Sequence, residues 1–288
     1  MPRDLRLPVT IFLTVSSLIS IRLLYLAEGS RSLAHVWWYG WVTALSTGLG
    51  ALPVGLAKGA MSTKWTGLSN AVAAGMMTAA SAALVEESLM LDAVDNAVMT
   101  PLQGVILGAV LGVVFVAASQ YLLSEAGENA HMCILDEGID ARRALLIVLV
   151  MTVHSFSEGI GIGASFGGKS GAELGMLVTT TLAVHNVPEG FAVSSVLVSK
   201  GMSVWGAALW STITSIPQPI MAVAAYSCVD AFVMIQPIGL GFAAGAMLWV
   251  AWLELFVESY EVCGLLSTAS VGVTSASLMS VCHAYLIA

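Results

Sequence analysis

Two copies of one short pattern place a histidine four residues before a glutamate. The first copy is His154 with Glu158 and the second is His185 with Glu189, and a glycine follows each glutamate. Residues at positions i and i+4 share one face of an α-helix, so each copy presents an imidazole and a carboxylate to the same point. Together the two copies offer the four nitrogen and oxygen ligands that a divalent metal ion would need.

Both copies lie in segments apolar enough to cross a bilayer, at residues 143–166 and 173–198. A carboxylate near the bilayer centre costs about 2.5 to 3.5 kcal/mol on insertion scales, so it needs an internal partner, a water-filled cavity or a metal ion. Only residues 167–172 link the two segments, which makes them antiparallel neighbours. We therefore expect the four side chains to meet near the bilayer midplane.

Four ligands of this kind suit zinc first, with iron(II), manganese and cobalt close behind. Ser155 and Asn186 follow the two histidines and can add oxygen atoms, and Pro188 predicts a kink beside the site. Two other interpretations stay open: polar pairs that bind nothing, and a metal-dependent hydrolase within the membrane. The sequence contains no HExxH motif of zinc hydrolases and no Walker loop that would indicate ATP-driven pumping.

The composition predicts an all-α fold, a polytopic membrane helix bundle in the plasma membrane or an organelle. Of 288 residues, 58% are hydrophobic and 10% are charged, and the mean hydropathy of +0.90 lies outside the range of soluble proteins. A net charge of −8 without a basic stripe excludes a nucleic-acid partner and fits a cation as substrate. The segments that approach the ~20 residues of a membrane span are 8–27, 37–57, 66–85, 100–123, 143–166, 173–198, 204–226, 236–257 and 266–288.

The sequence divides into an N-terminal hydrophobic segment, residues 1–36, and a transmembrane domain, residues 37–288. Arg22 and Tyr25 favour an uncleaved anchor over a cleaved signal sequence in the first part. Lysine and arginine are concentrated in alternate loops, which places the loop at 124–142 in the cytosol and Asp92 outside or in a lumen. Interfacial positions are expected for Trp37, Trp38, Tyr39, Trp41, His35 and His283.

The segment from His185 to Gly190 reads His-Asn-Val-Pro-Glu-Gly and resembles the signature of the ZIP (Zrt-, Irt-like protein) divalent metal transporters, above all their GufA-like branch. Residues 241–247 are similar to the family's seventh helix and residues 73–77 to its second. The resemblance covers about residues 41–288 and implies an eight-helix ZIP-type core that moves metal into the cytosol. It also implies a primary metal site at His154, Glu158, His185 and Glu189, with Asn186 in a neighbouring second site.

Two departures from the family pattern affect the implied metal site. Ser155 stands where many members have asparagine, and the neutral Gln218 stands where bacterial members have a glutamate in the sixth helix. Glu158 and Glu189 balance the charge of one divalent ion, and Gln218 cannot supply the third negative charge that a second ion would require. We therefore expect one tightly held ion. A sensor that binds metal without transporting it stays the non-enzymatic alternative, and a homodimer is compatible with the sequence.

Overall fold

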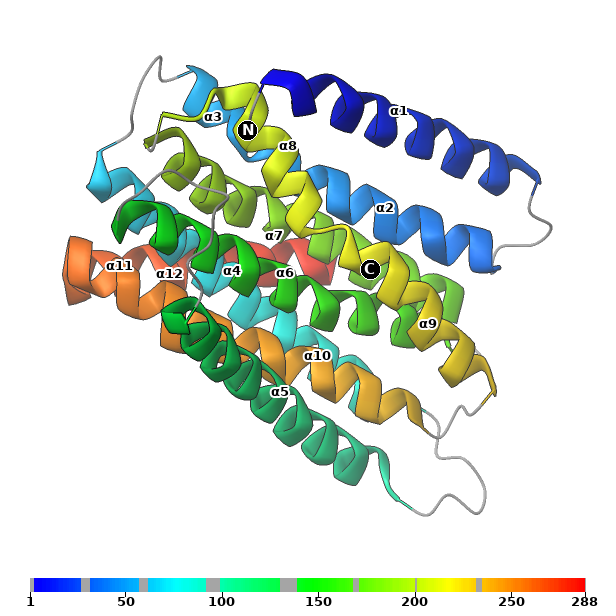
Figure 1. Ribbon diagram of the computed structural model, residues 1–288. Coiled ribbons are helices and arrows are strands. Elements are labelled where there is room, and N and C mark those ends of the chain that lie inside the picture. The colour runs from blue at the N-terminus through cyan, green and yellow to red at the C-terminus, as the bar shows by residue number, and fades with distance from the viewer. Residues whose placement is uncertain are drawn as a thin grey trace.

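The computed structural model describes residues 3–26, 32–56, 62–91, 99–129, 139–167, 171–199, 201–231 and 235–287. Within these ranges every regular element is a helix, which confirms the predicted all-α membrane bundle (Figure 1). The elements are α1 (Arg3–Leu26), α2 (Leu33–Leu49), α3 (Ala51–Leu56), α4 (Thr63–Leu89), α5 (Pro101–Asn129), α6 (Ile139–Ser165), α7 (Gly171–Ser199), α8 (Val204–Thr214), α9 (Pro217–Ala231), α10 (Gln236–Val250), the π-helical turn η2 (Ala251–Leu255), α11 (Phe256–Cys263) and α12 (Leu265–Ile287).

Four helical stretches in the described ranges are long and apolar enough to cross a membrane by length and composition alone. They are Thr63–Leu89, Pro101–Leu122, Gln236–Cys263 and Leu265–Tyr285. Each of the other predicted spans also coincides with a helix or a broken pair of helices, so the chain is a multi-pass membrane protein.

Several helices differ in detail from the sequence prediction. The span predicted at 37–57 is divided into α2 and α3, and the span at 204–226 is divided into α8 and α9. α5 extends to Asn129 and α6 begins at Ile139, so helix occupies part of the loop that we predicted at 124–142; residues 130–138 lie outside the described ranges. α7 is one continuous helix from Gly171 to Ser199, with Pro188 inside it.

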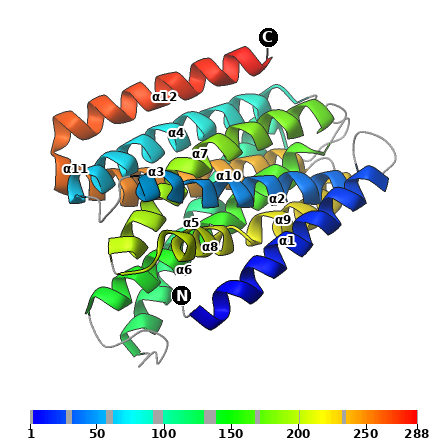
Figure 2. The same ribbon diagram turned by 90° about the horizontal axis from the view of Figure 1, so that it is seen from above.

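The central helices are α6 and α7, which carry the two histidine–glutamate pairs. α6 packs against α7, α9 and α10, while α7 also packs against α2 and α4. Figure 2 shows α12 along one edge of the bundle beside α4, and α1 along the opposite edge beside α2. The two pairs therefore lie in the interior, where neighbouring helices exclude lipid from them.

A glycine after each glutamate permits two of these close helix contacts. A Cβ atom at Gly159 would lie 2.6 Å from the backbone oxygen of Gln218 at the start of α9. A Cβ atom at Gly190 would overlap the backbone carbonyl of Thr47 on α2. Small residues are the usual means by which membrane helices approach each other this closely. The sequence Glu-Gly thus sets both the polar group and the packing beside it.

The N-terminal helix α1 is held against α2 by two tryptophans. The indole of Trp37 donates a hydrogen bond to Ser20 Oγ at 2.7 Å, and that of Trp41 donates to Ser17 Oγ at 2.8 Å. Trp41 is only 2% exposed and packs between α1 and α8. The indole N–H of Trp41 therefore has its partner inside the protein, and the interfacial position of this residue stays a prediction.

Candidate metal centre

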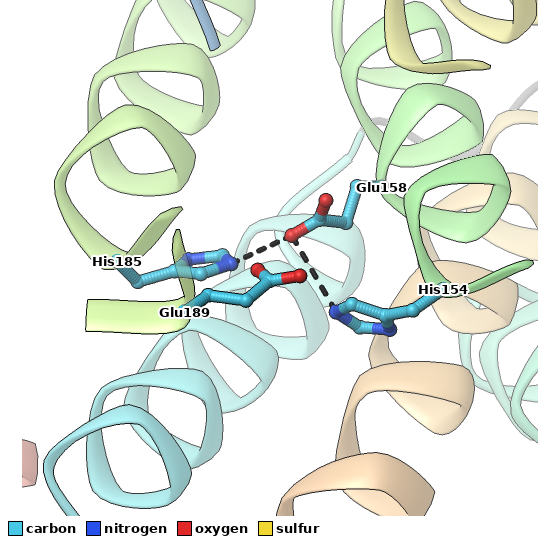
Figure 3. A group of neighbouring side chains, drawn as sticks. All are labelled: His154, Glu158, His185 and Glu189. Atoms are coloured by element: carbon cyan, nitrogen blue, oxygen red, sulfur yellow. Dashed lines mark hydrogen bonds and ion pairs between the residues drawn. The ribbon is translucent and has the colours of Figure 1, made fainter. Parts of the chain in front are cut away.

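Four buried side chains from α6 and α7 converge on one point, as Figure 3 shows. His154, Glu158 and His185 are fully buried, and Glu189 is 1% exposed. One ligand atom from each of the four residues can be chosen so that all lie within 4.8 Å of one another. The convergence follows from the i, i+4 spacing on two neighbouring helices, as we expected from the sequence.

Glu158 is the central member of the group. Its Oε1 atom lies 2.7 Å from Nε2 of His185 and 3.5 Å from Nε2 of His154 (Figure 3). The shorter contact crosses from α6 to α7. The two histidine–glutamate pairs are therefore not separate, because His185 of α7 contacts Glu158 of α6.

Several atoms of this group are buried without a hydrogen-bond partner in the described part of the chain. They are both ring nitrogens of His154, Nδ1 of His185 and Oε2 of Glu189. Leaving a buried polar atom unsatisfied costs about 1 to 3 kcal/mol. Imidazole nitrogens and carboxylate oxygens share the ability to donate a lone pair to a metal ion. The donor set therefore fits a divalent transition metal such as zinc, for which mixed nitrogen and oxygen ligands are common.

Two side-chain amides, those of Gln218 and Asn186, form a hydrogen-bonded chain that ends at the Glu158 oxygen not facing the histidines. The Nε2 group of Gln218 donates to Oε2 of Glu158, and Oε1 of Gln218 accepts from Nδ2 of Asn186 at 3.3 Å. The same Asn186 group also lies 3.1 Å from the backbone carbonyl of Thr43 on α2. These contacts fix the orientation of Glu158 while its other oxygen faces the histidines.

The other sequence-predicted residues take different places around the four. Gln218 touches the group through Glu158, whereas Asn186 is connected to it through Gln218. Ser155 is fully buried next to His154 in sequence, and its hydroxyl has no hydrogen-bond partner among the described residues. Thr43 was not expected near the site, since a backbone carbonyl has no signature in the sequence.

Comparison with known proteins places this geometry in a family. The family model described as ZIP zinc transporter matches residues 124–278, which is more than half of the chain. The zinc transporter GufA of Myxococcus xanthus is 31% identical over 226 residues, a match that covers 75% of this chain and 85% of GufA. The chain belongs to the ZIP zinc transporter family.

Other relatives match the ZIP-type region over different lengths. A candidate zinc transporter of Arabidopsis thaliana is 41% identical over 236 residues, which cover 82% of this chain. The chain spans only 36% of that relative's length. Zinc transporter ZIPB of Bordetella bronchiseptica is 32% identical over 136 residues, covering 47% of this chain and 43% of ZIPB.

Proposed function

We propose that this protein carries divalent transition-metal ions across a membrane and that His154, Glu158, His185 and Glu189 form the transport site. The observation that carries the proposal is the convergence of four buried ligand atoms from two neighbouring helices within 4.8 Å. Zinc is the proposed principal substrate, with iron(II) and manganese as the nearest competitors. We propose residues 37–288 as the transporting unit and α1 as an anchor packed on its edge.

Charge balance supports a cation as the occupant. Two buried carboxylates near the middle of membrane-spanning helices are unfavourable unless positive charge compensates them. A divalent ion between Glu158 and Glu189 would neutralise both, and the two imidazoles would complete its coordination. The low dielectric of the bundle strengthens this attraction and also disfavours any excess of charge of either sign.

The same balance supports one ion rather than two. Gln218 donates its amide hydrogen to Oε2 of Glu158, so that oxygen is engaged on the side away from the histidines. An amide N–H group repels a cation and supplies no negative charge. Anomalous scattering from zinc-soaked crystals tests this point. One strong peak at the four residues agrees with it, and two fully occupied peaks beside Glu158 contradict it.

Transport requires the four residues to face each side of the membrane in turn. We propose that this alternation is not driven by ATP, in keeping with the lack of a Walker loop in this sequence. We propose net movement toward the cytosol, on the side assigned by the lysine and arginine distribution. The interrupted pair α8 and α9 lies next to α6 and α7 and offers a break at which helix packing can change.

Two rival functions predict different results in one uptake assay. Purified protein in sealed proteoliposomes should take up zinc continuously, to many ions per protein molecule, and iron(II) or manganese in excess should slow that uptake. Saturation at one or two ions per molecule would instead indicate a sensor that binds without transport. Hydrolysis of a membrane peptide without uptake would indicate a hydrolase. Light scattering of the same preparation measures whether the protein is a monomer or the homodimer that the sequence allows.

A further inference from the structure

A further histidine–carboxylate pair, Glu87 and His283, is formed by residues outside the four-residue site. Glu87 is in the last turn of α4 and His283 is near the end of α12, two helices that pack side by side at one edge of the bundle (Figure 2). The side chains are only 19% and 11% exposed, respectively. The interfacial position that the sequence predicts for His283 stays a prediction, and the low exposure of its side chain shows that neighbouring helices cover most of it.

The distance between the two groups does not fit a hydrogen bond. Nε2 of His283 lies 3.8 Å from Oε1 of Glu87, whereas a direct N–H···O bond would be about 2.9 Å long. Both ring nitrogens of His283 are buried without a hydrogen-bond partner among the described residues. Two ligands that each lie roughly 2.1 Å from one metal ion can be separated by up to ~4.2 Å. The observed separation therefore matches two ligands of a shared ion better than a closed ion pair.

A small cavity lies beside this pair. It is lined by Glu87 and His283, by Thr181 of α7, and by apolar side chains that include Leu84 and Leu182. About 10 Å³ is open to the centre of a water-sized sphere, which is close to the minimum for one water molecule or one small ion. The Thr181 hydroxyl is buried, and within the described ranges it has no hydrogen-bond partner. An imidazole, a carboxylate and a hydroxyl thus border one small space with largely apolar walls.

This cavity is adjacent to the four-residue site along α7. Thr181 precedes His185 by four residues, which is one helical turn, or ~6 Å along the helix axis. Leu84 and Leu182, which line the cavity, are 3% and 1% exposed, so the cavity reaches into the buried part of the bundle. α7 therefore contributes to both groups of polar side chains.

We propose that Glu87, His283 and Thr181 form a second, weaker binding site for a divalent metal ion, in which the ion waits one helical turn from the transport site. Delivery of the waiting ion to the transport site rests on the proposed transport function. Binding of a metal ion by these three residues does not depend on that function. The described residues that line the cavity include one carboxylate and one imidazole, and water must complete the coordination. Such a site releases its ion more easily than one with two carboxylates and two imidazoles. This property suits a site that raises the local metal concentration.

The binding test uses zinc and the full-length protein. A Glu158→Ala/His185→Ala variant should retain about one weakly bound zinc ion per chain in equilibrium dialysis. Adding His283→Gln or Glu87→Gln should abolish this residual binding, whereas adding Glu86→Gln should not. Glu86→Gln is the matched control for Glu87→Gln, because Glu86 is exposed at the neighbouring position of α4 and both changes remove one carboxylate. No residual zinc, or residual zinc that survives His283→Gln, would overturn the proposal.

A second measurement avoids dependence on the folding of that double variant. In the otherwise unaltered protein, His283→Gln should lower the zinc stoichiometry from two to one and raise the half-saturating zinc concentration for uptake severalfold, with the maximal rate unchanged. A purely structural role for His283 would leave the stoichiometry at its original value and would refute the second site. Absence of uptake by the unaltered protein would refute the transport function instead, which keeps the two failures distinct.

Discussion

Replacement of Gln218 by alanine should weaken metal binding although Gln218 is not one of the four proposed ligands. Its amide donates to Oε2 of Glu158, and Glu158 approaches both histidines through its other oxygen. Removing a group that orients a metal ligand typically lowers affinity 10- to 100-fold. This range corresponds to about 1.4 to 2.8 kcal/mol of binding free energy. The maximal rate at saturating zinc should change little, because all four ligands remain.

The assay is zinc uptake into proteoliposomes at a series of zinc concentrations, with equilibrium dialysis on the same protein. Gln236→Ala is the matched control, since Gln236 is also a buried glutamine whose Nε2 group donates a hydrogen bond, in its case to the backbone oxygen of Gly167 at 3.1 Å. That variant should lose stability without losing zinc affinity. If Gln218→Ala binds zinc within twofold of the unaltered protein, or if Gln236→Ala weakens binding equally, the orienting role of Gln218 is refuted.

Three further predictions concern acid, packing and orientation. Zinc affinity should fall between neutral and mildly acidic pH, because protons compete with the metal for imidazole and carboxylate groups; an affinity that does not change would argue against histidine ligands. Gly190→Ala should lower the unfolding temperature in detergent by an amount equivalent to about 1 to 3 kcal/mol, because its Cβ would overlap the carbonyl of Thr47. Gly272→Ala should be almost neutral, since its Cβ would meet nothing nearer than 3.5 Å, and equal losses would contradict the packing argument. Cysteines placed at Asp92 and Asp136, in a background without native thiols, should react with an impermeant reagent from opposite sides of the membrane; reaction from one side would overturn the assigned orientation.

Sequence periodicity was sufficient for the central features of this protein. The i, i+4 spacing determined that His154 and Glu158 share a face, and the short connection to the next segment placed His185 and Glu189 opposite them. The long apolar segments predicted the helices. These features depend on local geometry and on the bilayer, both of which can be inferred from a single sequence.

Contacts between distant parts of the chain could not be inferred in the same way. The pairing of Glu87 with His283 joins residues almost 200 positions apart, and the hydrogen bond from Trp41 to Ser17 depends on how α1 docks. The hydrogen bond from Gln218 to Glu158 depends on the interruption between α8 and α9, because this interruption places the start of α9 beside α6. Packing rather than spacing determines each of these contacts.

The most direct test of the transport site is zinc uptake by four single alanine variants, at His154, Glu158, His185 and Glu189. Two control variants carry the same chemical changes elsewhere: Glu173→Ala, at an exposed position in the first turn of α7, and His35→Ala, at the start of α2. At equal amounts of folded protein, each of the four variants should lose uptake, and both controls should keep it. Normal uptake by any of the four, or equal loss in the controls, would contradict the assignment of the transport site.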